Sequence, residues 1–348
     1  MGAVGGTQIT NQHQIVIDNI NLEKIDAPAI EEKPAGENIL KNPDFSARAD
    51  GWENAVTAPG EAAVSFEENK AVYNIANVGT AGTNYVNWAH NNGYKVWALL
   101  SNNSDKPTTT EILNDYKLRE KLINNIVTAV VTFNLDGINL DFEYLNESDK
   151  DVYSRLVIEL APRIKELGKV LSVDVTAPDG SPDWSLCYDR NVIGDVADYI
   201  VFMGYDQNGV SSPKEGTTAG CDWVEANIKK FLGQEGVEAS KIILGTPFYT
   251  RIWTENNGSV TSKVVNMKNI ASNIPDGTKT TWDDSLKQNY AEYEKGGKTY
   301  KIWIEDAKSL RCKLELVNTY NLAGAAYWEK DRETNDEFWT FVKEQLNK

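Results

Sequence analysis

Hydrophobic and polar positions follow two different rhythms along most of this chain. From about residue 95 onward, short runs rich in Val, Ile and Leu alternate with longer segments in which apolar residues recur every three or four positions. The short runs are typical of buried β-strands, and the longer segments are typical of amphipathic helices. The predicted strands are residues 95–101, 137–143, 171–177, 199–205, 242–249 and 324–328.

The segments between these strands are predicted to be crossover helices. They include residues 111–131, 221–233 and 306–320, together with a helix after residue 143 that Pro162 should kink or split and Gly168 should end. Strands that alternate with crossover helices form a parallel sheet, and six such units in succession favour a (β/α)8 barrel. Functional residues of such barrels lie at the carboxyl ends of the strands.

Two parts of the chain do not follow this rhythm. Residues 253–304, with a Lys-Gly-Gly-Lys turn at 295–298, are expected to form a small β insertion before the last strand. Residues 14–23 alternate like an antiparallel strand, 26–36 resemble a linker, and 37–79 indicate short strands and turns. Because a closed barrel needs eight strands, the first two are either hidden in this region or missing.

The amino-acid composition and net charge favour some kinds of binding partner over others. The 348 residues are 41% hydrophobic and include 10 Trp and 15 Tyr, so the chain can build a large core and many flat surfaces. The formal net charge is −16 and the pI is near 4.7. Long-range repulsion therefore opposes binding to nucleic acid or to an anionic membrane, and a neutral polymer is favoured as partner.

The cysteines, the histidines and the amino terminus do not indicate a disulfide framework, a metal site or a secretion signal. Cys187, Cys221 and Cys312 are widely spaced and odd in number, so they predict neither a disulfide framework nor a zinc site and are expected to be buried or half-buried thiols. His13 and His90 form no cluster, and no glycine-rich phosphate loop occurs, so no metal or organic cofactor is indicated. The first residues lack a secretion signal, so the protein is either intracellular or exported by a segment outside this chain.

Residues 136–143 carry the clearest chemistry. In a strand, alternate side chains share a face, so Asn139, Asp141 and Glu143 project together, opposite Ile138, Leu140 and Phe142. Two carboxyl groups held close together cannot both ionise easily, so one keeps its proton near neutral pH and can act as an acid. Such pairs suit cleavage of glycosidic bonds. The alternative is a strand with a solvated acidic face, although Asp and Glu are poor strand formers.

These residues resemble a known family. Residues 136–143 are similar to the DxxDxDxE signature of glycoside hydrolase family 18, the family of chitinases and related N-acetylglucosaminidases. Residues 203–206 resemble its M-x-Y-D motif on the sixth strand, 245–251 its seventh strand, and 326–328 its eighth-strand tryptophan. The likeness spans about residues 82–345 and is greatest to bacterial members with compact insertions, including those that act on spore cortex peptidoglycan.

The amino-terminal region resembles parts of family 4/9 carbohydrate-binding modules. The predicted domains are a module remnant at 1–25, a linker at 26–36, the start of a second module at 37–80, and the hydrolase barrel at 81–348. If the second module breaks off near residue 80, the barrel lacks its first strands and exposes sheet edges, unless residues 60–79 supply substitutes.

The resemblance implies a role for ten residues. Glu143 is the expected acid, Asp141 is expected to orient the substrate's acetamido group, and Tyr205 is expected to hydrogen-bond that group's oxygen. The expected substrate-binding residues are Trp328, Asp206, Met203, Asn139 and Tyr249, and the expected structural residues of the motif are Asp136 and Gly137. Asn139 stands where the family has a middle acid, so it should hydrogen-bond Asp141 without sharing a proton with it.

The function that follows is cleavage of β-1,4 linkages at N-acetylglucosamine in chitin, chito-oligosaccharides or peptidoglycan. The implied mechanism is retaining and substrate-assisted, because the 2-acetamido carbonyl of the sugar replaces an enzyme nucleophile. The expected partner is an N-acetylglucosamine polysaccharide, and the expected location is extracellular or at the cell wall. The alternative is a carbohydrate-binding protein on the same scaffold, weak or inactive because its barrel is incomplete.

Overall fold

The computed structural model describes most of the predicted barrel region. It covers residues 62–67, 70–75, 78–329, 332, 338–339 and 341–342, with side chains from residue 82 onward. The predicted module remnant, the linker and residues 37–61 of the predicted second module lie outside these residues. The domain boundaries proposed there therefore stay predictions.

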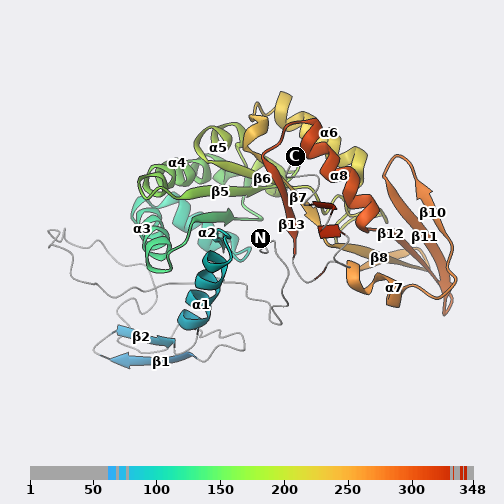
Figure 1. Ribbon diagram of the computed structural model, residues 1–348, viewed down its shortest axis with the longest axis horizontal. Coiled ribbons are helices and arrows are strands. Elements are labelled where there is room, and N and C mark those ends of the chain that lie inside the picture. Colours follow the sequence, from blue (N-terminus) through green and yellow to red (C-terminus); the bar gives the residue numbers. More distant parts are fainter. Residues whose placement is uncertain are drawn as a thin grey trace.

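A curled, wholly parallel sheet forms the centre of the molecule (Figure 1). Its strand order is β13-β7-β6-β5-β4-β3, and all six strands were predicted from the sequence. The strands are β3 (Trp97–Ser101), β4 (Gly137–Asp141), β5 (Val170–Val175), β6 (Tyr199–Met203), β7 (Ile242–Pro247) and β13 (Gly324–Trp328). Strands of this sheet that follow one another along the chain are neighbours, as the alternation of strands and helices in a (β/α)8 architecture requires.

Helices cover the outer face of this sheet (Figure 1). None of the helices in the described part of the chain has the length and apolar character that crossing a bilayer requires. The longer helices are α1 (Val78–Asn91), α2 (Lys106–Asn114), α3 (Tyr116–Thr132), α4 (Lys150–Glu166), α5 (Arg190–Val196), α6 (Cys221–Gly233) and α8 (Ala307–Thr319), and short turns are η1 (Glu147–Asp149), η2 (Pro182–Leu186) and η3 (Ala239–Lys241).

Two helices differ from their predictions. The helix expected over 111–131 is two helices, because Asp115 ends α2 in an extended conformation and its side chain accepts the Leu118 N–H at the start of α3. The helix α4 runs through Pro162 without splitting. It ends as expected at Gly168, whose φ of 65° lies in the left-handed region that favours glycine after a helix.

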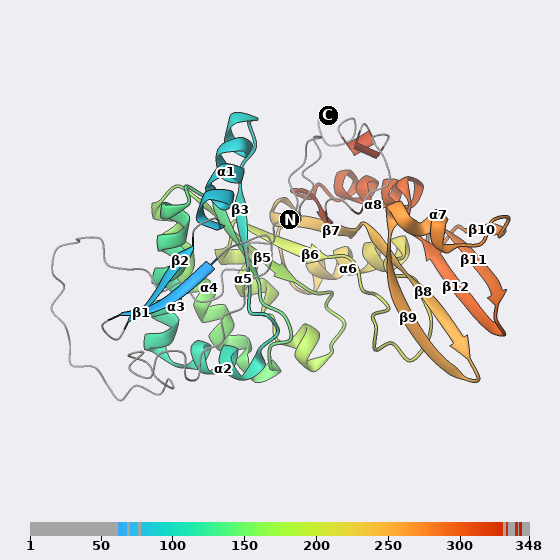
Figure 2. The ribbon, with the colours of Figure 1, turned by 90° about the horizontal axis from the view of Figure 1, so that it is seen from below.

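The sheet does not close into a ring within the described residues. Its edge strands are β3 and β13, and no described strand pairs with their outer edges. The strands β1 (Ala62–Glu67) and β2 (Lys70–Ile75) pair only with each other, and their hairpin lies at the opposite end of the molecule from the insertion (Figures 1 and 2). They therefore do not supply the substitute strands that an open barrel would need.

The predicted insertion is a separate antiparallel sheet at one end of the molecule (Figure 2). It begins at Tyr249, earlier than the expected residue 253, because the chain turns directly from β7 into the first insertion strand. The strand order is β10-β11-β12-β8-β9. Its elements are β8 (Tyr249–Asn256), β9 (Ser259–Asn266), η4 (Met267–Asn269), α7 (Ile270–Asn273), β10 (Thr280–Asp283), β11 (Gln288–Lys295) and β12 (Lys298–Ile304).

A buried ion pair joins the insertion to the barrel helices. The Nζ of Lys313 on α8 donates to Oε1 of Glu305, which follows β12, at 2.7 Å, and both side chains are 0% exposed. Ser309 donates to the same oxygen, and Gln288 donates to the other at 2.9 Å. Both oxygens of the Glu305 carboxylate therefore have hydrogen-bond partners. This matters because a buried charge without a partner is costly.

The cysteine prediction is wrong for two of the three residues. Cys221 at the start of α6 and Cys312 on α8 form a disulfide with an S–S distance of 1.98 Å, across a sequence separation of 91. The two helices pack side by side, which the sequence spacing does not reveal. Cys187 is a buried thiol as expected, and burial raises its pKa to about 11.

Candidate active site

Three strand ends bring the predicted site residues to one edge of the sheet. The strand β4 ends at Asp141 with Glu143 two residues beyond, β6 ends at Met203 just before Tyr205, and β13 ends at Trp328. The strands are parallel, so all three carboxyl ends lie at the same edge, where barrel enzymes carry their chemistry.

Asp141 and Glu143 form a hydrogen-bonded carboxyl pair. Burial raises the pKa of Glu143 to about 8, and the charge of Asp141, the hydrogen bond to Asp141 and the charge of Asp206 add to this effect. Burial also raises the pKa of Asp141. The hydrogen bond with Glu143 lowers this pKa, but by less than burial raises it. The proton at neutral pH therefore lies on Glu143, which is an acid aimed at an ionised neighbour.

The backbone of Glu143 is held from the adjacent strand. The side chain of Asn102, directly after β3, donates from Nδ2 to the Glu143 carbonyl oxygen at 2.9 Å and accepts the Glu143 N–H on Oδ1 at 3.0 Å. The hydroxyl of Tyr188 donates to the Phe142 carbonyl oxygen at 2.7 Å. These bonds fix the strand end that presents the acid, and the sequence analysis did not identify either residue.

Two tyrosines and an aspartate lie near the carboxyl pair. Burial raises the pKa of Tyr205 well above its ordinary value, and nearby carboxylates add to this, so its hydroxyl remains a donor. The Tyr249 hydroxyl donates to Oδ1 of Asp206 at 2.8 Å. Asp206 has a φ of 54°, a conformation that costs about 1–3 kcal/mol for a residue other than glycine. Arg251 lies 3.9 Å from the same oxygen and helps to hold it.

Asn139 does not have the expected partner. Its Nδ2 donates to the Ser172 hydroxyl at 3.0 Å and to Oδ1 of Asp174 at 2.7 Å, both on β5. No hydrogen bond joins it to Asp141 among the described residues, and its buried Oδ1 has no partner there. Asp174 is a site residue that the analysis of the sequence missed, although the alternation of residues 171–177 places it on the polar face of its strand.

Two further predicted substrate contacts lie at strand ends. Met203 is buried as the last residue of β6, and Trp328 is partly exposed as the last residue of β13. The Trp328 carbonyl oxygen accepts the Phe248 N–H at 2.7 Å, and the peptide bond from Trp328 to Glu329 is cis. Their roles toward a sugar stay predictions.

Asp136 and Gly137 lie at the other end of β4, away from the carboxyl pair. Burial raises the pKa of Asp136, but hydrogen bonds from the Val96 N–H and from His90 outweigh this and hold it below its ordinary value. A Cβ on Gly137 would lie 2.5 Å from the Val170 carbonyl oxygen. Both residues therefore anchor the motif strand, and His90 takes part in that anchor.

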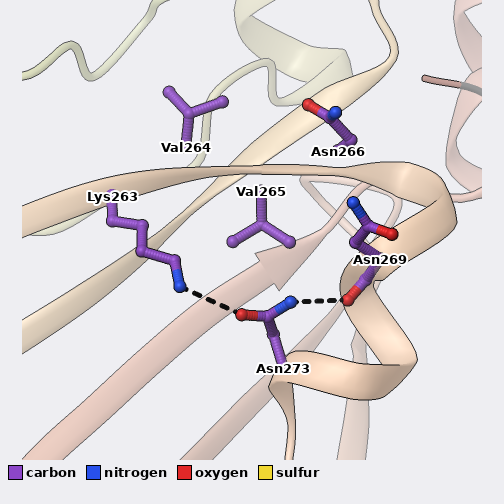
Figure 3. Close-up of a pocket in the computed structure, with 6 residues that line it drawn as sticks. All are labelled: Lys263, Val264, Val265, Asn266, Asn269 and Asn273. Atoms are coloured by element: carbon purple, nitrogen blue, oxygen red, sulfur yellow. Dashed lines mark hydrogen bonds between the residues drawn. The ribbon is translucent and has the colours of Figure 1, made fainter. Parts of the chain in front are cut away.

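A polar pocket elsewhere is not part of this site. It lies between β9 and α7 of the insertion, where Lys263 donates to Asn273 at 3.1 Å (Figure 3). None of the predicted site residues lines it. Trp253 on β8 is 1% exposed and donates to the Gly216 carbonyl oxygen, so it is buried where the insertion meets the segment between β6 and α6.

A parallel (β/α) sheet with a protonated glutamate beside an aspartate at its strand ends defines a class, the barrel glycosidases. The particular family follows from comparison. The family model Glycosyl hydrolases family 18 matches residues 50–333, which is most of the chain. The protein belongs to glycosyl hydrolase family 18. The match begins inside the segment 37–80 that we assigned to a second carbohydrate-binding module.

The chain is also similar to individual glycosylases and chitinases. The uncharacterized glycosylase YvbX of Bacillus subtilis (strain 168) is 25% identical over 290 residues, which are 80% of this chain and 81% of the relative. The cortical fragment-lytic enzyme of the same organism is 24% identical over 68% of this chain, and the chain spans only 56% of that enzyme. A chitinase crystal structure from Chromobacterium violaceum ATCC 12472 has a TM-score of 0.69 and 25% identity, covering 76% of this chain and 84% of that one.

Proposed function

We propose that the protein hydrolyses β-1,4 linkages at N-acetylglucosamine by substrate-assisted, retaining catalysis. The observation that carries the proposal is the buried carboxyl pair, in which Glu143 keeps its proton up to a pH of about 8 beside Asp141. A general acid must be protonated at the working pH, and an ordinary glutamate is not. Family membership and the relatives that are chitinases and cortex-lytic enzymes support the substrate class.

The chemistry has two steps. Glu143 donates its proton to the departing glycosidic oxygen while the carbonyl oxygen of the sugar's 2-acetamido group bonds to the anomeric carbon, which gives an oxazolinium ion. Asp141 accepts the acetamido N–H and stabilises the positive charge, and the Tyr205 hydroxyl donates to the acetamido oxygen. Water then attacks the anomeric carbon, gives its proton to the Glu143 carboxylate, and restores the acetamido group with retention of configuration.

Trp328 and Asp206 complete the proposed sugar site. The partly exposed ring of Trp328 supplies an apolar floor for the sugar, because ring faces stack on the C–H face of a pyranose. Asp206 is held by Tyr249 and Arg251 and is available to a sugar hydroxyl through its second oxygen. Met203 and Asn139 lie behind these groups, and we assign them to shaping the wall of the site.

Turnover of a chromogenic chitobioside tests this proposal. The variant Glu143→Gln should lose at least about a hundredfold in kcat and keep its affinity for chito-oligosaccharides, because an amide of similar shape cannot give up a proton to the leaving oxygen. The matched control is Asp195→Asn, which neutralises an exposed carboxylate on α5 and should change neither value. Unchanged turnover in the Glu143 variant, or an initial product with inverted anomeric configuration by NMR, would contradict the mechanism.

Relatives of two kinds suggest two polymers as the substrate. The chitinase structure suggests chitin, and the cortical fragment-lytic enzyme suggests peptidoglycan of the spore cortex. Turnover of chitin oligosaccharides and of purified cortex fragments by one preparation would assign the substrate. Action on either polymer is consistent with work outside the cell or at its wall, and the disulfide fits such an oxidising location.

The second candidate function is carbohydrate binding without effective catalysis. It is favoured by the open parallel sheet, because six strands are present in the described residues and eight close a barrel. Affinity and turnover measured on the same sample separate the two functions. Micromolar binding of chitotriose without detectable hydrolysis of any N-acetylglucosamine polymer would favour binding over catalysis.

A further inference from the structure

A buried acid, Asp174, lies on β5, the strand that pairs with β4. The side chain of Asp174 is 6% exposed, and its Oδ1 accepts a hydrogen bond from Nδ2 of Asn139 at 2.7 Å. No ion pair joins it to a basic side chain in the part of the chain that the structure describes. Burial raises its pKa well above the ordinary value, and the charges of Asp141 and Glu143 act in the same direction. These surroundings favour the neutral form of the acid, which carries an O–H donor.

Asn139 in its present orientation leaves two buried acceptors unsatisfied. Its own Oδ1 has no hydrogen-bond partner among the described residues, and neither has Oδ1 of Asp141, two positions along the same face of β4. Buried polar atoms without partners are uncommon in folded proteins. A half-turn of the amide exchanges its donor and acceptor ends without moving any other atom.

We propose that Asp174 is a positioning residue of the active site, which donates its carboxyl proton to Oδ1 of Asn139 and thereby turns the Asn139 amide N–H toward Asp141. In this arrangement the Ser172 hydroxyl donates to the same Oδ1. Asp141 then accepts from Asn139 on one side and from Glu143 on the other. The inference rests on the proposed function, because its purpose is to keep Asp141 ionised while Glu143 holds the proton.

The titratable groups that face Asp174 come from three neighbouring elements. Asp141 ends β4 and Glu143 follows it, Tyr205 follows β6, and Tyr153 lies on α4. Burial raises the pKa of both tyrosines well above the ordinary value, so neither changes its charge near neutral pH. Asp174 and the Ser172 hydroxyl both contact Asn139, and of these two only Asp174 is an acid whose proton can fix the direction of the amide.

Two substitutions separate positioning from packing. Asp174→Asn keeps a donor at this place, and its kcat should stay within about threefold of the parent protein. Asp174→Val fills similar space without a donor, so kcat should fall at least about tenfold with little change in KM, and the acid limb of the kcat/KM profile should move to higher pH. The control is Val175→Ala, which shortens a buried residue on the opposite face of β5 and should leave the profile unchanged. Equal losses in both Asp174 variants, or a parental profile in Asp174→Val, would overturn the inference.

A spectroscopic measurement tests the inference without catalysis. The infrared difference spectrum between the parent protein and Asp174→Asn at pH 7 should show the loss of one protonated carboxyl band. Loss of an ionised carboxylate band instead would overturn the inference even if Asp174→Val does not fold. A protein that hydrolyses no N-acetylglucosamine polymer but shows the protonated band would contradict the proposed function and still support the protonated Asp174.

Discussion

The pH dependence of hydrolysis is the sharpest consequence of the site. Glu143 has a pKa of about 8, compared with 4.5 for an ordinary glutamate, because it is buried beside Asp141. At pH 7 a group with a pKa of 8 is about nine-tenths protonated, whereas one with a pKa of 4.5 is about 0.3% protonated. The protonated fraction of Glu143 at pH 7 is therefore about 300 times that of an ordinary glutamate, and only the protonated form can act as the acid.

The sign of the effect follows from the form that reacts. The acid must be protonated, so kcat/KM should be high below pH 8 and should fall as the pH rises through about 8. Because the two carboxyl groups share a hydrogen bond, this limb belongs to the pair and not to Glu143 alone. The profile is measured as initial rates on a chromogenic chitobioside at substrate concentrations far below KM.

The informative perturbation is Asp141→Asn. It removes the charge that is the second cause of the raised pKa, whereas burial, the largest cause, remains. The alkaline limb of the residual activity should therefore move below pH 8 but stay well above 4.5. Asp195→Asn is the control, because this exposed carboxylate on α5 should leave the limb in place.

Two results would refute this reasoning. One is an alkaline limb of the parent protein below about pH 6, which would mean that Glu143 is not the buried acid that the structure describes. The other is an identical limb in the parent protein and in Asp141→Asn, which would remove the charge of Asp141 as a cause of the shift.

Three further predictions concern stability and positioning. Replacing both Cys221 and Cys312 with Ala should lower the free energy of unfolding by about 4.6 kcal/mol, from the chain entropy of a loop across 91 residues, and a loss below about 1 kcal/mol in urea titration would contradict this. Asn102→Ala should lower kcat about tenfold or more by freeing the acid's backbone, and an unchanged kcat would argue that the two bonds are dispensable. Lys313→Met should destabilise the fold by about 3–5 kcal/mol because Glu305 is left buried and unpaired, which thermal unfolding at pH 7 would reveal or exclude.

Local pattern accounts for the elements that were predicted correctly. The six parallel strands and the helices α6 and α8 were predicted from the spacing of their apolar residues. This spacing is set within a few residues, because side chains repeat on one face every two positions in a strand and every three or four in a helix. The same locality explains Gly168 at a helix end. It also explains why the split at Asp115 was missed, since the apolar spacing continues through a residue that acts as a cap for both helices.

The amino-acid sequence by itself determined the rhythm of the parallel sheet, the acidic motif at the end of one strand and the family to which the chain belongs. Tertiary structure alone decided which distant groups meet that motif: Asn102 on the Glu143 backbone, Asp174 behind Asn139, and the disulfide from Cys221 to Cys312. Crossover helices bring parallel strands together over tens of residues, and no local pattern records which side chains then become neighbours. The pKa of Glu143 depends on that burial, so its chemistry was visible in the sequence only as a possibility and became specific when the strands assembled.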